Sequence, residues 1–188
     1  MKRFLIAASL LFSVCFAFSQ DKSYKGDGID SYLEYSPYVA VLAMKIGGVE
    51  GASSWKRLAV NGGLSFVMTA GITQILKHTI HERRPDGTDN HAFPSGHSAI
   101  VFSGATVLHK EYGKLSPWIS VAGYGIATFT AVDRVIRHRH KWHDVAIGAA
   151  IGVASTELGY YLGDKITGER SRFSVAPTPN GISMTLNF

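Results

Sequence analysis

Long apolar stretches alternate with short polar clusters along this chain. A charge-free stretch covers residues 58–76, and largely apolar stretches follow at 95–112, 117–132 and 140–163. Each is long enough for a helix of four or more turns, and a shorter one is expected at 37–49. Segments rich in charge, Gly or Pro separate them. The pattern predicts an all-α fold, a helical bundle of about five to six helices.

The stretch at 58–76 carries a regular set of small polar residues. They recur every four positions, and in a helix they form one stripe: Asn61, Ser65, Thr69 and Thr73. We expect this stripe to pack closely against another helix. The stretch is also long enough to cross a bilayer. The sequence leaves open whether the helices span a membrane or form a water-soluble bundle.

The two ends of the chain differ from this middle part. Lys2 and Arg3 precede an apolar run at 4–18, which predicts a signal peptide at residues 1–19, with an uncleaved N-terminal anchor as the alternative. Residues 20–30 are polar and Gly-rich and are predicted to be a flexible leader. Residues 31–168 form the predicted helical domain. The Asn180-Gly181 turn predicts a short C-terminal β-hairpin tail at 169–188.

Composition limits the classes of function. The 188 residues are 46% hydrophobic, which fits one domain with a sizeable core. The net charge of +5 is mild and falls by two if the signal is cleaved, so no nucleic-acid partner is expected. Cys15 is the only cysteine and lies in the predicted signal. A mature chain would therefore have no disulfide and no cysteine nucleophile.

Two polar clusters supply groups that bind an oxyanion. Lys77 is expected near the end of its helix, with Arg84-Pro85 across a short loop. Arg offers a planar fork for two phosphate oxygens and Lys a point charge. Pro94-Ser95-Gly96-His97 lies where a loop enters a helix, whose N-terminal N–H groups favour an anion. His97 there is placed to protonate a leaving oxygen.

The third cluster contains Arg134, His140 and Asp144. A carboxylate four residues after a histidine can hold one ring nitrogen on a helix and leave the other to attack phosphorus. Two other interpretations are a solvated basic loop and a metal site. The metal site would use His138, His140, His143 and Asp144. Four nearby Arg and Lys residues oppose a cation, so no metal is expected.

These clusters together resemble the type 2 phosphatidic acid phosphatase (PAP2) superfamily, which also contains vanadium haloperoxidases. The family pattern is Lys-x6-Arg-Pro, then Pro-Ser-Gly-His, then Ser-Arg-x5-His-x3-Asp. Lys77, Arg84, His97, Arg134, His140 and Asp144 match it at the required spacings. One departure is Asp133, where the family has Ser. Another is Trp142, in a segment that is usually small or contains Pro.

The resemblance implies a role for each matching residue. The nucleophile would be His140, forming a phosphohistidine, with Asp144 as its partner and His97 as the general acid. The phosphate would be bound by Lys77, Arg84, Ser95, Gly96 and Arg134. The resemblance implies a metal-independent mechanism without a cofactor, in which vanadate acts as an inhibitor.

The function implied is an envelope phosphatase that hydrolyses phosphate monoesters or pyrophosphates. A lipid substrate is expected, such as phosphatidate, phosphatidylglycerophosphate, undecaprenyl pyrophosphate or a lipid A phosphate. The expected location is the bacterial cell envelope, membrane-associated or periplasmic, with the site facing the periplasm. One alternative is a soluble periplasmic non-specific acid phosphatase. The other is a vanadium-dependent haloperoxidase, with vanadate as its cofactor.

Overall fold

The computed structural model describes residues 30–169 and, for the backbone alone, residues 173–178 and 181–186. The predicted signal peptide and all but the last residue of the predicted leader lie outside the described residues. Asp30, that last residue, begins a helix and is buried. Six helices lie within the described range 30–169: α2 (Asp30–Leu33), α3 (Ser36–Ile46), α4 (Trp55–Thr79), α5 (Gly96–Tyr112), α6 (Pro117–Ile136) and α7 (Trp142–Thr167).

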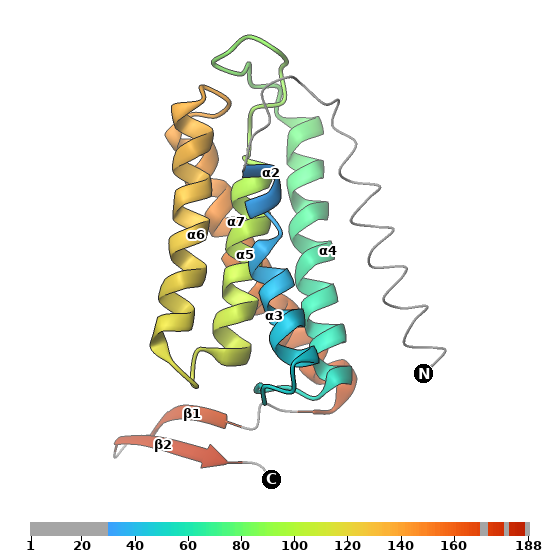
Figure 1. The fold of residues 1–188 in the computed structure, drawn as a ribbon. Coiled ribbons are helices and arrows are strands. Elements are labelled where there is room, and N and C mark those ends of the chain that lie inside the picture. Colours follow the sequence, from blue (N-terminus) through green and yellow to red (C-terminus); the bar gives the residue numbers. More distant parts are fainter. Residues whose placement is uncertain (1–29, 170–172, 179–180, 187–188) are drawn as a thin grey trace.

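The helices form the predicted bundle, with α5 near its centre (Figure 1). Helix α5 packs against α3, α4, α6 and α7, and α7 also packs along α4. The short helices α2 and α3 follow one another alongside α5. Within the predicted tail, β1 (Phe173–Thr178) pairs antiparallel with β2 (Gly181–Leu186).

Side-chain caps explain where most of the long helices begin. The side chains of Ser54, Ser95 and Ser116 accept hydrogen bonds from backbone N–H groups in the first turns of α4, α5 and α6. Helix α7 ends at Gly168, which has a φ of 69°. Helix α6 runs four residues beyond the predicted end at Val132, because nothing before Arg137 stops it.

The polar stripe of α4 is buried against α7, as predicted. Ser65, Thr69 and Thr73 each donate a hydrogen bond to the carbonyl four residues earlier in α4, at 2.7–2.8 Å. Their hydroxyls are therefore satisfied within their own helix. On the facing side of α7, a Cβ atom added at Gly159 would lie 2.8 Å from the backbone nitrogen of Ser65. The two helices touch along backbone, which only small residues permit.

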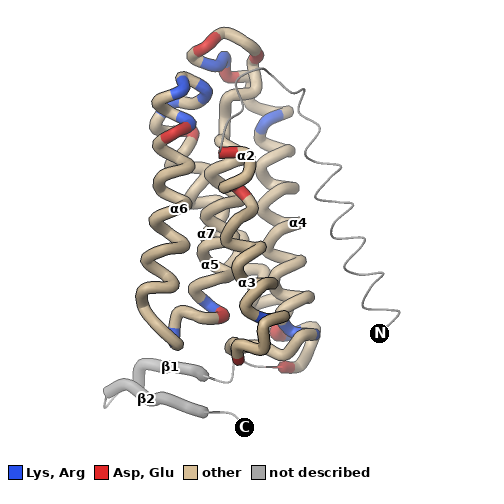
Figure 2. The backbone as a smooth tube through the Cα atoms, viewed as in Figure 1, with Lys and Arg blue, Asp and Glu red and all other residues tan. Residues whose placement is uncertain are grey.

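The outer faces of the long helices are apolar, in contrast to the polar stripe inside. Helices α4, α6 and α7 are each long and apolar enough to cross a membrane. Charged residues of the bundle gather toward its two ends, apart from the region of α2 (Figure 2). Glu157, exposed on α7, pairs with Lys110 at 2.7 Å. The exposed large apolar residues of these helices include Val67, Ile75, Trp118, Val121, Phe129, Ile136, Leu158, Tyr161 and Ile166.

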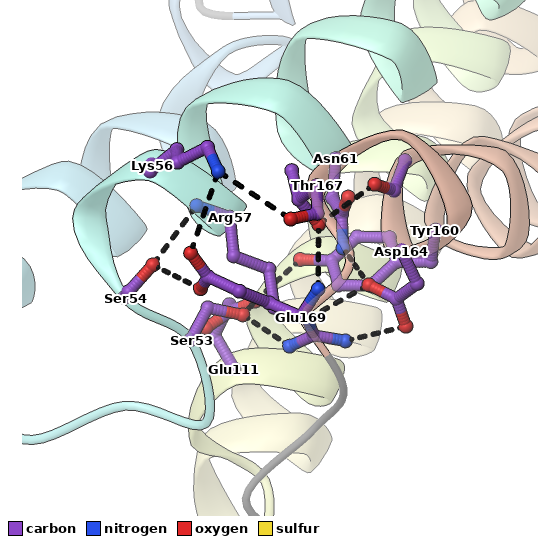
Figure 3. A network of polar contacts seen from close by, with 11 residues as sticks. Ser53, Ser54, Lys56, Arg57, Asn61, Glu111, Tyr160, Asp164, Thr167 and Glu169 are labelled. Carbon is purple, nitrogen blue, oxygen red and sulfur yellow. Dashed lines mark hydrogen bonds and ion pairs between the residues drawn. The ribbon is translucent and has the colours of Figure 1, made fainter.

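A polar network closes the end of the bundle away from the three clusters (Figure 3). The buried Arg57 of α4 donates two hydrogen bonds to Asp164 of α7, at 2.7 and 2.9 Å. Glu111 of α5 accepts from Ser53 at 2.6 Å and from Tyr160 at 2.7 Å. These bonds join α4, α5 and α7 through buried groups, which makes each partner costly to remove.

The contact at Gly159 gives a test of the helix packing. Gly159→Ala should lower the free energy of unfolding by about 2 kcal/mol, because the new methyl group meets backbone atoms of Ser65 that cannot move aside. Gly71→Ala, also in a helix, is the control, since a Cβ there meets nothing within 4 Å. It should stabilise slightly through helix propensity. Thermal unfolding of the purified variants followed by circular dichroism measures both, and equal midpoints would contradict the packing.

Candidate active site

The three sequence clusters meet at one end of the bundle. Lys77 lies in the last turn of α4, Arg84 in the loop that follows, and His97 in the first turn of α5. Arg134 lies in the last turn of α6, and His140 precedes α7. Helices α4 and α6 thus end where α5 and α7 begin, at the upper end in Figure 1. The fold brings together every site residue that the sequence predicted.

Contacts between loops fix the geometry of this end. Asp86, in the loop after α4, forms an ion pair with Arg139 at 2.9 Å, and its backbone N–H donates to the carbonyl of His138. Lys141 contacts Glu82 of the same loop at 2.6 Å. The backbone N–H of Ser95 donates to the carbonyl of Asp144 at 3.0 Å. The first and second clusters are therefore each tied directly to the third.

The cations that would bind phosphate are already held by oxygen atoms. Lys77 donates to the carbonyl of His91 at 2.9 Å. Arg84 is buried, and its Nε donates to Asp89 at 2.8 Å. Within the described residues, Nη1 of Arg84 is buried without a hydrogen-bond acceptor. An anion between the clusters would satisfy that nitrogen.

The start of α5 supplies backbone donors next to these cations. Ser95 is the N-cap, and its side chain accepts from the N–H of Ser98. Gly96 lies beside the Lys77 side chain: a Cβ atom added at Gly96 would lie 3.7 Å from Lys77 Cε. The free N–H groups of this first turn and the positive end of the helix both favour a bound anion.

His140 is almost fully buried and faces Asp144. The two side chains are 3.7 Å apart, between His140 Nδ1 and Asp144 Oδ2. The sequence predicted both residues on one helix, but α7 begins at Trp142, so His140 lies in the turn before it. The reason is Asp144, which accepts the backbone N–H of Lys141 at 2.8 Å and so caps the helix at that point.

Burial keeps His140 neutral. Its pKa is lowered from 6.5 to about 4, first by burial and then by the positive charges of Lys77, Arg84 and Arg134, while Asp144 acts in the opposite direction. The three cations are therefore close enough to act on one imidazole. A neutral imidazole keeps a lone pair for nucleophilic attack at neutral pH.

His97 is partly buried, and its pKa lies well below 6.5 through desolvation and the charges of Arg134, His140 and Lys77. Asp30 acts against this lowering. His97 belongs to α5, which is not one of the three helices long and apolar enough to cross a membrane. Its Nε2 is 3.5 Å from a carboxylate oxygen of Glu34. A bound phosphate dianion would add negative charge here and favour the protonated ring that a general acid needs.

Sequence reasoning missed two acidic residues of this site. Asp30 of α2 is fully buried and forms an ion pair with Arg134. Glu34, one turn later, is buried beside His97. The Gly-rich composition before Asp30 led to the prediction of a flexible leader. The signal that could have found them is their spacing of four residues, directly ahead of the helix start at Ser36-Pro37.

The two departures from the family pattern have visible surroundings. Asp133 forms an ion pair with Arg137 at 2.9 Å. Trp142 is exposed on the first turn of α7.

One group of side chains near the site has metal-ligand character. Glu82, His143 and Asp144 place one ligand atom each within 4.8 Å of one another. His138 and His140, which the sequence had offered as ligands, are not part of this group. Lys141 binds the same Glu82 carboxylate, and its positive charge opposes a cation there.

Acid should destabilise the protein through His140. The unfolded chain takes up this proton near pH 6.5 and the folded protein only near pH 4, so stability falls as the pH drops through that window. The loss from this residue is about 3 kcal/mol. The thermal unfolding midpoint should therefore fall less between pH 7 and pH 4 in His140→Gln than in the parent. Equal falls would contradict the buried neutral imidazole.

Comparisons with known proteins identify relatives of this chain. The chain is 39% identical over 168 residues to a lipid A 1-phosphatase of Porphyromonas gingivalis. The matched region covers 86% of this chain and 38% of that protein. It is 28% identical over 123 residues to a PA-phosphatase related-family protein of Dictyostelium discoideum, covering 52% of this chain and 45% of that one. The chain thus spans less than half the length of either relative.

A solved structure and a family model cover the helical part. The crystal structure of LpxE from Aquifex aeolicus has a similar fold, with a TM-score of 0.56 and 20% identity over 80% of this chain and 94% of that one. The model of the PAP2 superfamily matches residues 58–167, which include all three clusters. The chain belongs to the PAP2 superfamily.

Proposed function

We propose that this protein is a membrane-bound phosphatase that removes phosphate from a lipid phosphate monoester or pyrophosphate through a phosphohistidine. The observation that carries this proposal is the buried, neutral His140. It lies beside Asp144 and within the field of Lys77, Arg84 and Arg134. A nucleophile and the cations that stabilise its target are thereby held in one place.

The reaction has two balanced steps. The free ring nitrogen of His140, Nε2, attacks phosphorus while Asp144 stabilises the positive ring at Nδ1, and the bond from phosphorus to the leaving oxygen breaks. His97 gives its proton to that oxygen. Water then attacks the phosphohistidine, His97 takes a proton from the water, and inorganic phosphate leaves with His140 restored.

The phosphate oxygens carry most of the charge, so their binding decides the rate. Arg84 and Arg134 offer planar forks, Lys77 a point charge, and Ser95 and Gly96 the donors at the start of α5. On binding, phosphate competes with Asp89 for Arg84. No step of this mechanism uses a metal or a cofactor. Vanadate, which resembles the five-coordinate phosphorus, is expected to inhibit.

A lipid substrate is supported by the outside of the bundle. Helices α4, α6 and α7 are long and apolar enough to cross a membrane, and their outer faces expose large apolar side chains. A helix of 25 residues such as α4 is about 37 Å long, which exceeds the hydrocarbon thickness of about 30 Å. We place the helical domain, residues 31–168, in the bacterial envelope with its site facing the periplasm. Residues 1–19 serve as its signal peptide or anchor.

The 39% identity to a lipid A 1-phosphatase makes a lipid A phosphate the first substrate to examine. Phosphatidate, phosphatidylglycerophosphate and undecaprenyl pyrophosphate follow. A soluble non-specific acid phosphatase would not need the apolar outer faces of α4, α6 and α7. A vanadium haloperoxidase would use the same anion site, and bromination that depends on vanadate would identify it.

The nucleophile gives the direct test. The purified protein should release phosphate from at least one of these lipids in the presence of EDTA. His140→Ala should lower the rate by about 10⁴-fold or more. His109→Ala, an exposed histidine in the last turn of α5, is the matched control and should keep the parent rate. Quenched turnover should trap an acid-labile phosphoenzyme in the parent alone, and full activity of His140→Ala would refute the assignment.

A further inference from the structure

Helix α2 and the turn after it bring two further acidic side chains into the active site, beside Arg134 and His97. Asp30 and Glu34 are four residues apart, so they project from the same side of this short helix and the turn after it. Both are buried, with 0% and 7% of their surfaces exposed. Buried carboxylates are costly unless they are paired, so their positions need an explanation.

The two carboxylates have different neighbours. Asp30 is in an ion pair with Arg134, and both side chains are fully buried. Glu34 places Oε2 at 3.5 Å from Nε2 of His97. Such contacts are often long in a free enzyme and shorten when substrate binds.

The charges around His97 make this second contact important. Lys77 from α4, Arg134 from α6 and His140 from the turn before α7 all oppose a positive charge on the His97 ring. Asp30 of α2 favours that charge, and Glu34, in the turn after α2, lies beside the ring. Asp30 also forms an ion pair with Arg134, whereas Oε2 of Glu34 lies 3.5 Å from Nε2 of the His97 ring.

We propose that Glu34 is a positioning residue for general acid catalysis, holding the Nε2–H of His97 so that Nδ1–H faces the leaving oxygen. The inference rests on the proposed phosphatase function and deepens it. When the bond to phosphorus breaks, the proton on Nδ1 moves to the leaving oxygen, and His97 remains as a neutral ring whose Nε2–H still donates to Glu34. The arrangement repeats at the acid what Asp144 does at the nucleophile.

Leaving groups of different basicity separate this role from a structural one. p-Nitrophenolate leaves without a proton, whereas the alkoxide of dodecyl phosphate leaves only as the alcohol. Glu34→Gln should lower kcat for dodecyl phosphate by about 100-fold and kcat for p-nitrophenyl phosphate by less than about 5-fold. It should also move the fall of activity at high pH to a lower pH, since the protonated His97 ring loses its carboxylate.

Four further variants complete the experiment. His97→Ala should give the same dependence on the leaving group, and Glu34→Gln combined with His97→Ala should be no slower than His97→Ala alone. Glu34→Asp keeps the charge and should retain most of the activity on dodecyl phosphate. Glu111→Gln changes a buried glutamate at the far end of the bundle and should affect both substrates equally.

The outcomes are distinct. Equal losses on both substrates in a folded Glu34→Gln protein, or additive losses in the double variant, would overturn the role of Glu34. If Glu34→Gln does not fold by circular dichroism, Glu34→Asp decides, and an equal loss on both substrates there overturns the role as well. A parent that cleaves neither these substrates nor the lipids would instead remove the proposed function itself.

Discussion

The contact between the first turns of α5 and α7 determines the geometry of the whole site. A Cβ at Gly148 would lie 2.5 Å from the carbonyl oxygen of Ser95, so only glycine allows this approach. Within the same contact the N–H of Ser95 donates to the carbonyl of Asp144. The phosphate-binding helix start and the carboxylate of the nucleophile are therefore fixed relative to each other by backbone. Side-chain rearrangement alone cannot separate them.

A second constraint is the repulsion among the grouped cations. Arg84 is accompanied by Asp89 and Arg134 by Asp30, and each of these pairs places one carboxylate on a guanidinium that is expected to bind phosphate. The carboxylates compensate buried positive charge while no substrate is bound. Binding of a phosphate dianion is then an exchange of one oxyanion for another. The carboxylates that compensate these cations, Asp30 and Asp89, lie outside the three sequence clusters.

Much of this arrangement was predictable from the sequence, for physical reasons that differ between elements. The spacing of Lys77, Arg84, His97, Arg134 and His140 is set by how helix ends meet, and it was sufficient to predict that these residues gather at one end of the bundle. Ser95, the N-cap of α5, and Pro117, the first residue of α6, predicted where these helices begin. These features depend on residues close together in the chain, which is the range in which sequence patterns are informative.

The elements that were missed depend on tertiary contacts. Helix α2 has only four residues and no apolar periodicity, so its place comes from the ion pair between Asp30 and Arg134, 104 residues away in sequence. The turn at His140 depends on the side chain of Asp144 capping α7 rather than extending it. In both cases the partner of a carboxylate, Arg134 for Asp30 and the N–H of Lys141 for Asp144, is set by the packed fold and cannot be read from the sequence pattern.

The hydroxyl stripe of α4 has a consequence for how the protein assembles. Ser65, Thr69 and Thr73 bond to carbonyls of their own helix, so α4 carries few unmet polar groups even before α7 reaches it. A segment of this kind can enter a bilayer alone and dock later, because docking neither makes nor breaks those bonds. The register between α4 and α7 is then selected by shape at glycines such as Gly159. Insertion of α4 into the bilayer and its association with α7 are then separable stages. The fit of small residues such as Gly159 matters only for the association.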